Sequence, residues 1–547
     1  MQTHRKWEVL NSEIPQSLED IERILLSNRN IKTKEEINNF INPKIEDVNS
    51  KSVGIDKTHL ETAVKRIHKA IKEKEQIIIF GDYDVDGICG TAILWETLNS
   101  AGAKVSPYIP NRIEEGYGLS VAGITNVKNQ FPDTSLIITV DNGIVASGSV
   151  DFANSLNIDV IITDHHTVGP IIPKAVSIVH TTKLCGTAVA WVLSKEFEKE
   201  LSNHLDLVAL ATVADLVPLT DSNRTLLKFG LKELRCTKRV GLLCLFEEAG
   251  IEKEKIDTYE IGHVIAPRLN AMGRLENAMD SLRLVCTKDI KRAKKLAQLL
   301  SDTNKERQDV TREATIHASS FVRESKMNDK KLLFVVHESY EPGVIGLVAG
   351  KLVEEFYRPS IVLSKGEKFS KASARSVAGF NIIDFIRQSS EFLVDAGGHP
   401  MAAGFTVENE NLEKLQKKFE ELVEGLLNDD HFIRNLRIDS TLDFSFLNFD
   451  LLDLLSKLSP YGMANPQPVF TTEKVEILDI KLVGKEGKHA KFFLSKDDFK
   501  ISAIGFGMGE LISKIHVGDY VNIAYSIDDD IWNGNRRMQL KLKDIIV

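Results

Sequence analysis

Aspartate and histidine side chains follow three short apolar segments of the chain. Carboxylates crowded together cannot all stay ionised unless positive charge compensates them. A ligand set of carboxylate oxygens with one or two imidazoles is typical of Mn²⁺ or Mg²⁺ rather than zinc. Two such cations could activate water and stabilise the leaving oxygen of a phosphodiester. The residues concerned are Asp82, Asp84 and Asp86 after the first segment, Asp141 after the second, and Asp164, His165 and His166 after the third.

Each motif alone has a simpler interpretation. A single Asp after a strand is usually a helix cap or a turn residue, and Asp141-Asn142-Gly143 by itself is typical of a turn. The run from Asp82 to Gly87 resembles a calcium loop, but an EF-hand needs Glu at its twelfth position, where this chain has Ile93. Three such motifs, each directly after an apolar segment, indicate a shared site instead.

The apolar segments that precede the motifs predict the element that brings them together. Ile77–Phe80, Val105–Ile109, Leu136–Val140 and Val160–Thr163 are short and rich in β-branched residues. Such runs, separated by helical segments, predict an α/β fold with a doubly wound parallel sheet. Ligands bind outside the carboxyl ends of the strands in such a sheet, so we expect the carboxylates to meet in one crevice.

The remaining chain predicts further domains. A long charged segment without Gly or Pro predicts one connecting helix, and a second α/β unit begins at Leu332–Val336. Five short alternating strands after Lys474 indicate a small barrel, for which an OB-fold is the leading candidate. The expected division is a helical lead-in (1–55), a catalytic domain (56–287), a long helix (288–327), a substrate-binding α/β domain (328–428) and an OB-like nucleic-acid-binding barrel (429–547).

Composition excludes some classes and leaves function open. The 547 residues carry a net charge of -9, which argues mildly against a nucleic-acid binder but does not exclude a local basic groove. We find neither a membrane-spanning apolar run nor a secretory signal. The five cysteines form no CxxC pair, so we expect no disulfide framework and no structural zinc, as is typical of a cytoplasmic protein.

The ordered motifs resemble the DHH phosphoesterase family, whose name describes the triplet Asp164-His165-His166. Asp215, in Ala211-Thr-Val-Ala-Asp215-Leu-Val-Pro-Leu219, is similar to the fourth metal-ligand motif of that family. Later segments resemble the RecJ-like exonucleases within it, over nearly the whole chain. These segments are Ile265–Leu275, Pro342–Gly346, Ser373–Ser376, Gly397–Phe405, Pro460–Phe470 and Trp532–Leu540.

The resemblance implies a two-lobed core around a cleft and a role for each matching residue. Two Mn²⁺ or Mg²⁺ ions would be held by Asp82, Asp84, Asp86, Asp141, His165 and Asp215. A water between the ions would attack phosphorus, with charge on the phosphate stabilised by His166 and a histidine oriented by Asp164. The residues expected to hold or order the nucleic acid are Arg112, Tyr117, Arg268, Asn270, Arg274, Ser373, Arg375, Gly397, Gly398 and His399.

The implied function is a 5′-to-3′ exonuclease that degrades single-stranded DNA to mononucleotides in DNA repair and recombination. Single-strand-binding protein and a repair helicase are the partners that the family suggests. Two alternatives stay open: a phosphodiesterase for short oligonucleotides or cyclic dinucleotides, and a replication-associated scaffold without catalysis. The chain departs from the RecJ pattern at Tyr340-Glu341, where Trp-His is common, and in a shorter segment after His166.

Overall fold

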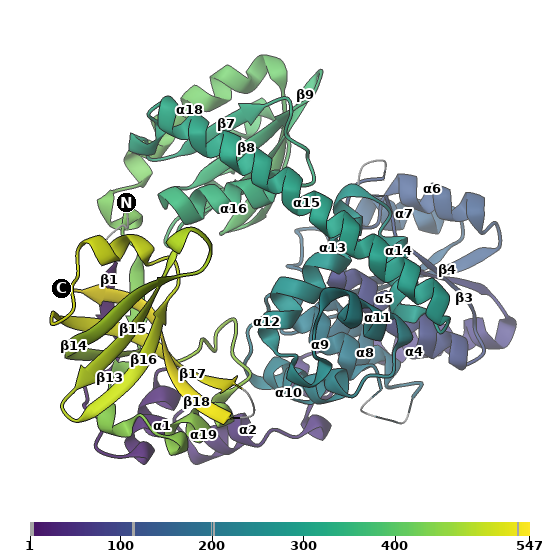
Figure 1. Cartoon of the computed structure of the whole chain (residues 1–547). Coiled ribbons are helices and arrows are strands. Elements are labelled where there is room, and N and C mark those ends of the chain that lie inside the picture. Colours follow the sequence, from purple (N-terminus) through teal and green to yellow (C-terminus); the bar gives the residue numbers. More distant parts are fainter. Residues whose placement is uncertain (1–4, 112–114, 199, 201–202, 533–534) are drawn as a thin grey trace. The chain divides into compact units, whose positions relative to one another are not determined.

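A computed structural model describes residues 5–111, 115–198, 200, 203–532 and 535–547, and its elements are labelled in Figure 1. The chain forms two compact units. The larger unit contains Trp7–Gly273, Asn277–Leu299 and Arg437–Val547. The smaller unit contains Met1–Lys6, Arg274–Glu276 and Leu300–Leu436. The five-part division expected from the sequence stays a prediction.

The larger unit contains the predicted parallel sheet, which is confirmed. Every residue of strand β2 (Gln76–Phe80) is buried, as expected for a strand covered on both faces. The register pairs Phe80 with Thr139 and Val140 with Thr163, so the strands end at one edge of the sheet. In spatial order the strands are β3 (Lys104–Tyr108), β2 (Gln76–Phe80), β4 (Thr134–Val140), β5 (Asp159–Asp164) and β6 (Ser177–His180).

Helices cover this sheet on both faces. Apolar side chains of α6 and α7 form one core with Ile78, Phe80 and Ile162, whereas α5 and α8 pack against each other and against the sheet. Most residues of α5 are buried, which explains its continuous apolar sequence. The helices are α4 (Lys57–Glu73), α5 (Val85–Ser100), α6 (Val121–Gln130), α7 (Ser147–Ser155), α8 (Gly186–Ser194), α9 (Leu205–Ala214), α10 (Asp221–Arg235), α11 (Val240–Ala249), α12 (Thr258–Glu260), α13 (Ala266–Leu275) and α14 (Met279–Cys286).

The C-terminal strands form the predicted barrel. Strand β14 pairs with both β15 and β17, and this second pairing closes the sheet on itself in the order β14-β15-β16-β18-β17. The OB-like interpretation is therefore confirmed. The strands are β13 (Ser440–Thr441), β14 (Phe470–Val483), β15 (His489–Lys496), β16 (Phe499–Gly505), β17 (Tyr520–Trp532) and β18 (Asn535–Ile546), and helix α19 (Phe449–Leu458) precedes the barrel.

The N-terminal segment packs far from its sequence neighbours. Ile21, Leu25 and Phe40 belong to the same apolar core as the barrel residues Phe470 and Phe492. A short strand in this segment pairs with a strand just before the barrel, a pairing that the sequence did not predict. The elements are β1 (Lys6–Val9), α1 (Leu18–Ser27), α2 (Lys34–Ile41), α3 (Ser50–Val53) and β12 (Asn435–Ile438).

The smaller unit is the second α/β domain. Its sheet has the order β10-β11-β9-β8-β7, in which only β7 and β8 are parallel. The long helix α15 (Ile290–Glu324) confirms the predicted connecting helix and runs from the larger unit into the smaller one. The other elements are β7 (Leu333–His337), α16 (Ile345–Phe356), β8 (Ser360–Lys365), β9 (Phe369–Arg375), α17 (Ile382–Arg387), β10 (Leu393–His399), β11 (Ala402–Glu408) and α18 (Leu412–Leu426).

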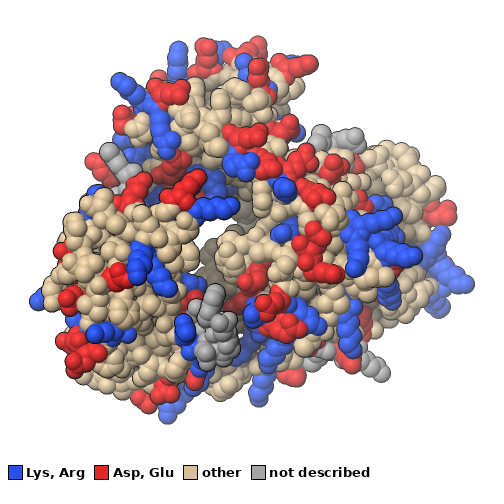
Figure 2. All heavy atoms as spheres, viewed as in Figure 1, with Lys and Arg blue, Asp and Glu red and all other residues tan. Residues whose placement is uncertain are grey.

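The surface carries both signs of charge. Figure 2 shows Lys and Arg side chains interspersed with Asp and Glu over the visible face, in keeping with the modest net charge of -9. Within the described residues, no helix is both long enough and apolar enough to span a membrane.

Candidate active site

The first aspartate motif forms the tight connection between β2 and α5. Asp84 caps the helix, because its Oδ1 accepts hydrogen bonds from the N–H groups of Asp86 (2.9 Å) and Gly87 (3.1 Å). A Cβ on Gly87 would lie 2.5 Å from the backbone N of Asp82, so only glycine allows this turn. Burial, together with the charge of Asp86, raises the pKa of Asp84.

Asp86 lies at the N-terminus of α8. Its two carboxylate oxygens accept hydrogen bonds from the N–H groups of Gly186 (2.6 Å) and Thr187 (2.7 Å). These two hydrogen bonds from the start of the helix fix the orientation of the Asp86 carboxylate. A Cβ on Gly186 would lie 2.9 Å from the Cα of Asp141, so this glycine also brings α8 against the second motif. This role of Gly186, which begins a buried apolar helix, was not predicted from the sequence.

Asp141 lies in the middle of the site. Its backbone has a positive φ of 62°, and the residue is 2% exposed. Among the described residues its Oδ1 accepts no hydrogen bond, although His165 Nε2 lies 3.0 Å away. Burial and the neighbouring carboxylates raise the pKa of Asp141 well above its ordinary value. A buried carboxylate oxygen without a hydrogen-bond donor is costly, and a cation would remove that cost.

Asp164 orients the second histidine. Its Oδ1 accepts hydrogen bonds from the backbone N–H of His166 and from Nδ1 of the same residue, at 3.1 and 2.8 Å. Burial alone would raise the pKa of Asp164, but these bonds and the N–H of Ile144 keep it below its ordinary value. Burial alone would lower the pKa of His166, whereas the Asp164 contact and nearby carboxylates raise it to about 9.

The ring of His165 lies beside the carboxylates of Asp86 and Asp215. Its Nε2 lies 3.7 Å from both Asp86 Oδ2 and Asp215 Oδ2. Burial lowers the pKa of His165, so the neutral ring offers a lone pair. Asp215 caps the C-terminal end of α9, and burial with the charges of Asp86 and Asp84 raises its pKa to about 8.

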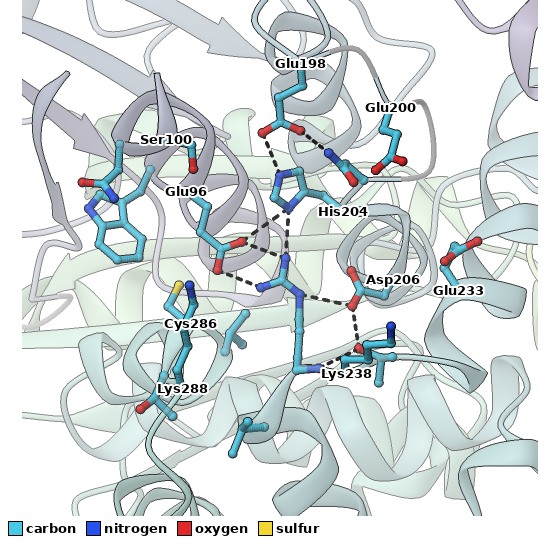
Figure 3. A pocket seen from close by; sticks show the side chains of 18 of the residues that line it. Glu96, Ser100, Glu198, Glu200, His204, Asp206, Glu233, Lys238, Cys286 and Lys288 are labelled. Carbon is cyan, nitrogen blue, oxygen red and sulfur yellow. Dashed lines mark hydrogen bonds and ion pairs between the residues drawn. The ribbon is translucent and has the colours of Figure 1, made fainter. Parts of the chain in front are cut away.

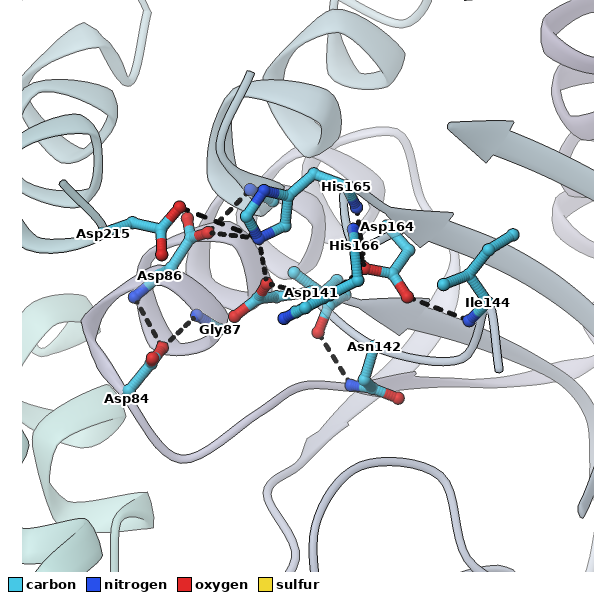
Figure 4. A network of polar contacts seen from close by, with 12 residues as sticks. Asp84, Asp86, Gly87, Asp141, Asn142, Ile144, Asp164, His165, His166 and Asp215 are labelled. Carbon is cyan, nitrogen blue, oxygen red and sulfur yellow. Dashed lines mark hydrogen bonds and ion pairs between the residues drawn. The ribbon is translucent and has the colours of Figure 1, made fainter. Parts of the chain in front are cut away.

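The motifs therefore meet as the sequence predicted (Figure 4). Three overlapping groups have ligand atoms within 4.8 Å of one another. These groups are Asp82, Asp84 and Asp141; Asp86, His165 and Asp215; and Asp141, His165 and His166. Because carboxylate oxygens dominate and a neutral imidazole is available, the donor set fits one or two hard divalent cations such as Mn²⁺ or Mg²⁺.

Two of the expected nucleic-acid contacts, Tyr117 and Asn270, lie beside this cluster. Tyr117 is about half exposed, and its hydroxyl lies 3.2 Å from His166 Nε2. Asn270 accepts a hydrogen bond from the N–H of Val85 (2.9 Å), so it orders the first motif. Arg268 donates to Val264 O, just before α13 begins. Arg112 lies outside the described residues.

In the smaller unit, Arg375 and Ser373 lie beside the start of a helix. Helix α16 has no side-chain cap at its N-terminus, and a Cβ on Gly346 would lie 2.9 Å from both Arg375 Nη2 and Ser373 Oγ. Arg375 donates to Ser373 Oγ and to Ala374 O, and its guanidinium makes no ion pair among the described residues. Arg274 donates to Gly343 O, just before the helix. A helix N-terminus with such neighbours suits a phosphate.

The Gly-Gly-His segment lies on the same sheet. The register aligns His399 with Ala402, and Ala402 with Arg375, so His399 and Arg375 occupy one row. Gly398 has a φ of 142°, and a Cβ there would lie 2.5 Å from Ala402 O, so its glycine is required by the hairpin. A Cβ on Gly397 would meet no atom within 4 Å.

A cavity of about 870 Å³ lies elsewhere in the larger unit, near the C-terminal half of α5 (Figure 3). Several of its charged groups pair with one another. Arg239 donates to both carboxylate oxygens of Glu96, at 2.8 and 2.9 Å, and to Asp206 at 3.1 Å. None of the predicted site residues that the structure describes lines this cavity, and we assign no chemistry to it.

The parallel sheet with its Asp-His-His edge and the second α/β domain define a DHH-type phosphoesterase. Family models match in three places: the DHH family N-terminal domain at residues 76–212, the DHHA1 domain at 328–425 and the RecJ OB domain at 438–544.

Curated relatives and a solved structure narrow the class. The chain is 36% identical over 500 residues to the single-stranded-DNA-specific exonuclease RecJ of Bacillus subtilis, covering 89% of this chain but 63% of that protein. It is 30% identical over 519 residues to the Haemophilus influenzae RecJ, covering 88% and 89%. The crystal structure of RecJ in complex with Mn²⁺ from Thermus thermophilus matches with a TM-score of 0.84 at 26% identity, covering 99% of this chain and 79% of that one. The chain belongs to the RecJ family.

Proposed function

We propose that this chain is a two-cation-dependent exonuclease that hydrolyses single-stranded DNA from the 5′ end to mononucleotides, in DNA repair and recombination. The observation that carries the proposal is the convergence of Asp82, Asp84, Asp86, Asp141, His165 and Asp215 at one sheet edge. These six side chains are the proposed cation ligands. Bound cations would supply an activated water and neutralise charge on the phosphate.

His166 and Asp164 have a separate task in this proposal. The hydrogen bond with Asp164 and the nearby carboxylates raise the pKa of His166 to about 9, which favours the protonated ring. A protonated imidazole beside the cluster stabilises negative charge that develops on the phosphate. Tyr117, whose hydroxyl contacts the same ring, is the proposed stacking surface for a base.

Recognition of the 5′ end is proposed for the smaller unit. Arg375, Ser373 and the uncapped N-terminus of α16 offer N–H and hydroxyl donors to a terminal phosphate. Arg274 and His399 would contact neighbouring phosphates. Arg112, Arg268, Asn270, Gly397 and Gly398 complete the proposed set that holds or orders the strand.

The barrel is the proposed platform for the rest of the strand. On its outer surface Phe493 is 41% exposed, and the register places it beside Asp479 and Ser502. Lys491, on the same face, pairs with Lys481 across the strands. An exposed ring with lysines nearby suits single-strand binding, since bases stack on the ring and cations attract phosphates.

We also propose a cytoplasmic setting, with single-strand-binding protein and a repair helicase as partners. The five cysteines are free thiols, in keeping with a reducing compartment. The partner proposal rests on family resemblance. Calorimetric titration of the chain with purified single-strand-binding protein tests it, and the absence of binding heat at micromolar concentrations would remove that partner.

The function is tested by Mn²⁺-dependent digestion of 5′- and 3′-end-labelled single strands, with a duplex and a dinucleotide alongside. We expect early release of the 5′ label as a mononucleotide from long single strands, and slow cleavage of the duplex. Cleavage of the dinucleotide alone would support the short-substrate phosphodiesterase. Cleavage of no substrate at any Mn²⁺ concentration would support the scaffold instead.

A further inference from the structure

The first turn of helix α10 connects the fourth motif to two other parts of the larger unit. Asn223 is 4% exposed, and its Nδ2 donates hydrogen bonds to Lys183 O (2.9 Å) and Pro218 O (3.1 Å). Because both acceptors are carbonyls, only an N–H₂ group at this position satisfies them. One side chain therefore joins two loops that are distant in the sequence.

Both loops lead to proposed cation ligands. Pro218 follows Asp215 by three residues, and between them Leu216 adopts a positive φ of 57°. Lys183 precedes Gly186, whose N–H holds the carboxylate of Asp86. A shift of either carbonyl would therefore move a ligand or the donor that orients a ligand.

Arg224, the next residue along α10, contacts the barrel domain (Arg437–Val547 of the larger unit). Arg224 is 1% exposed, and its guanidinium lies 3.7 Å above the ring of Phe40. It donates to Phe40 O at the end of α2 and to four carbonyls at the end of α19. These are Lys457 O (3.2 Å), Leu458 O (3.0 Å), Ser459 O (2.7 Å) and Pro460 O (3.4 Å). A cation is favourable at helix C-termini.

A third contact links the loop after Asp215 to the barrel domain. The N–H of Leu219 donates to Met463 O at 2.8 Å, and a Cβ on Gly462 would lie 2.6 Å from Leu219 Cδ1. Segment 457–463 of the barrel domain thus packs directly on the loop that follows Asp215.

We propose that Asn223 is a positioning residue for the cation centre. Arg224 makes the position of the loops that Asn223 joins depend on how the barrel domain packs against them. The inference rests on the proposed function. Removing Asn223 or loosening Arg224 should disturb Asp215 and Asp86 without touching the DNA-binding residues. The expected signature is weaker cation binding and a lower kcat, with an unchanged KM for the strand.

The test compares Asn223→Ala, Arg224→Lys and their double variant with the unaltered full chain. Arg235→Lys is the matched control, because Arg235 lies on the same helix and donates to one backbone carbonyl, Ile256 O. Mn²⁺ affinity is measured by electron paramagnetic resonance without DNA, and kcat and KM on a labelled single strand. Removal of a group that orients a ligand typically weakens metal binding about 10- to 100-fold, and we expect this range for Asn223→Ala.

We expect Arg224→Lys to weaken Mn²⁺ binding less than Asn223→Ala does. The double variant should bind Mn²⁺ as tightly as Asn223→Ala alone, since both substitutions act on the same loops. Folded variants with unchanged Mn²⁺ affinity would overturn the proposal. So would a raised KM with normal Mn²⁺ affinity, which would assign the junction to DNA binding. If the unaltered chain binds Mn²⁺ but cuts no DNA, the proposed function is refuted. The role of Asn223 and Arg224 is then still tested by the Mn²⁺ affinities of the variants.

A second variant covers the case in which the first ones do not fold. Gly462→Ala removes no hydrogen bond but presses on Leu219, whereas Gly148→Ala in α7 meets no atom within 4 Å. We expect the first to weaken Mn²⁺ binding several-fold and the second to leave it unchanged. Equal affinities in the two variants would overturn the proposal.

Discussion

At the scale of single residues, the site is held by groups that are not themselves proposed ligands. Asp164 fixes His166, Asn270 fixes the first motif through the N–H of Val85, and Gly186 donates to Asp86. The aspartates and histidines were predictable, because their residue types and order have a chemical meaning. The roles of Gly186 and Asn223 were not, because a glycine in an apolar run and an asparagine at a helix start have many common explanations.

Asp141→Asn tests the charge of the central carboxylate. Asn tolerates the left-handed backbone at this position, so the fold should survive. Removing a buried charge beside other carboxylates should raise the thermal midpoint of the cation-free protein. The same change should abolish most Mn²⁺-dependent cleavage of single strands. Scanning calorimetry and the cleavage assay measure the two effects.

Asp151→Asn is the matched control, because Asp151 is exposed on α7. We expect neither property to change in that variant. A cation-free Asp141→Asn protein that is less stable than the unaltered chain would show that Asp141 is not under electrostatic strain.

Addition of Mn²⁺ should stabilise the folded chain by mass action. At a hundred times the dissociation constant, one bound ion contributes about 2.7 kcal/mol. Thermal denaturation with increasing Mn²⁺, and after removal by EDTA, measures the shift. The Asp141→Asn variant should show a smaller shift, and equal shifts in both proteins would indicate that Mn²⁺ binds elsewhere.

At the scale of elements, the ends of strands and the starts of helices bring the chemistry together. The strands β2, β4 and β5 were visible in the sequence because buried parallel strands are continuous apolar runs. Strand β6, at the edge of the sheet, was not, since Ser177–His180 is short and alternates in burial. The approach of α8 to the second motif was also hidden, because it depends on tertiary packing.

Gly186→Ala tests that approach. The added methyl group would meet the Cα of Asp141 at 2.9 Å and its Cβ at 2.6 Å, neither of which can move freely. We expect a loss of activity of about tenfold or more, because misplacing a reacting group by about 1 Å can cost roughly 100-fold. Steady-state kinetics on a single strand measures it. Gly148→Ala serves as the control, and similar rates for both variants would contradict the packing role.

At the scale of the whole molecule, the ends of the chain form one core. The sequence predicted the barrel from its strand pattern and a helical N-terminal segment from its polarity. It could not predict that α1 and α2 pack in the core of the barrel, because nothing local marks contacts over hundreds of residues.

Leu25→Ala tests this shared core. Leu25 is fully buried with the barrel residues, and such a substitution typically costs about 2–5 kcal/mol of unfolding free energy. Urea unfolding followed by tryptophan fluorescence measures the change. Leu482→Ala is the control, because Leu482 is 54% exposed on the barrel. Equal stability of the two variants would mean that the N-terminal helices do not support the barrel.

We propose that the edge of the parallel sheet holds two divalent cations. Anomalous diffraction at the manganese edge, from crystals of the unaltered chain grown with Mn²⁺, tests it most directly. We expect two peaks about 3.5–4 Å apart, as in other two-cation sites, in contact with Asp141 and His165. A single peak there, or manganese bound only elsewhere in the chain, would contradict the two-cation centre.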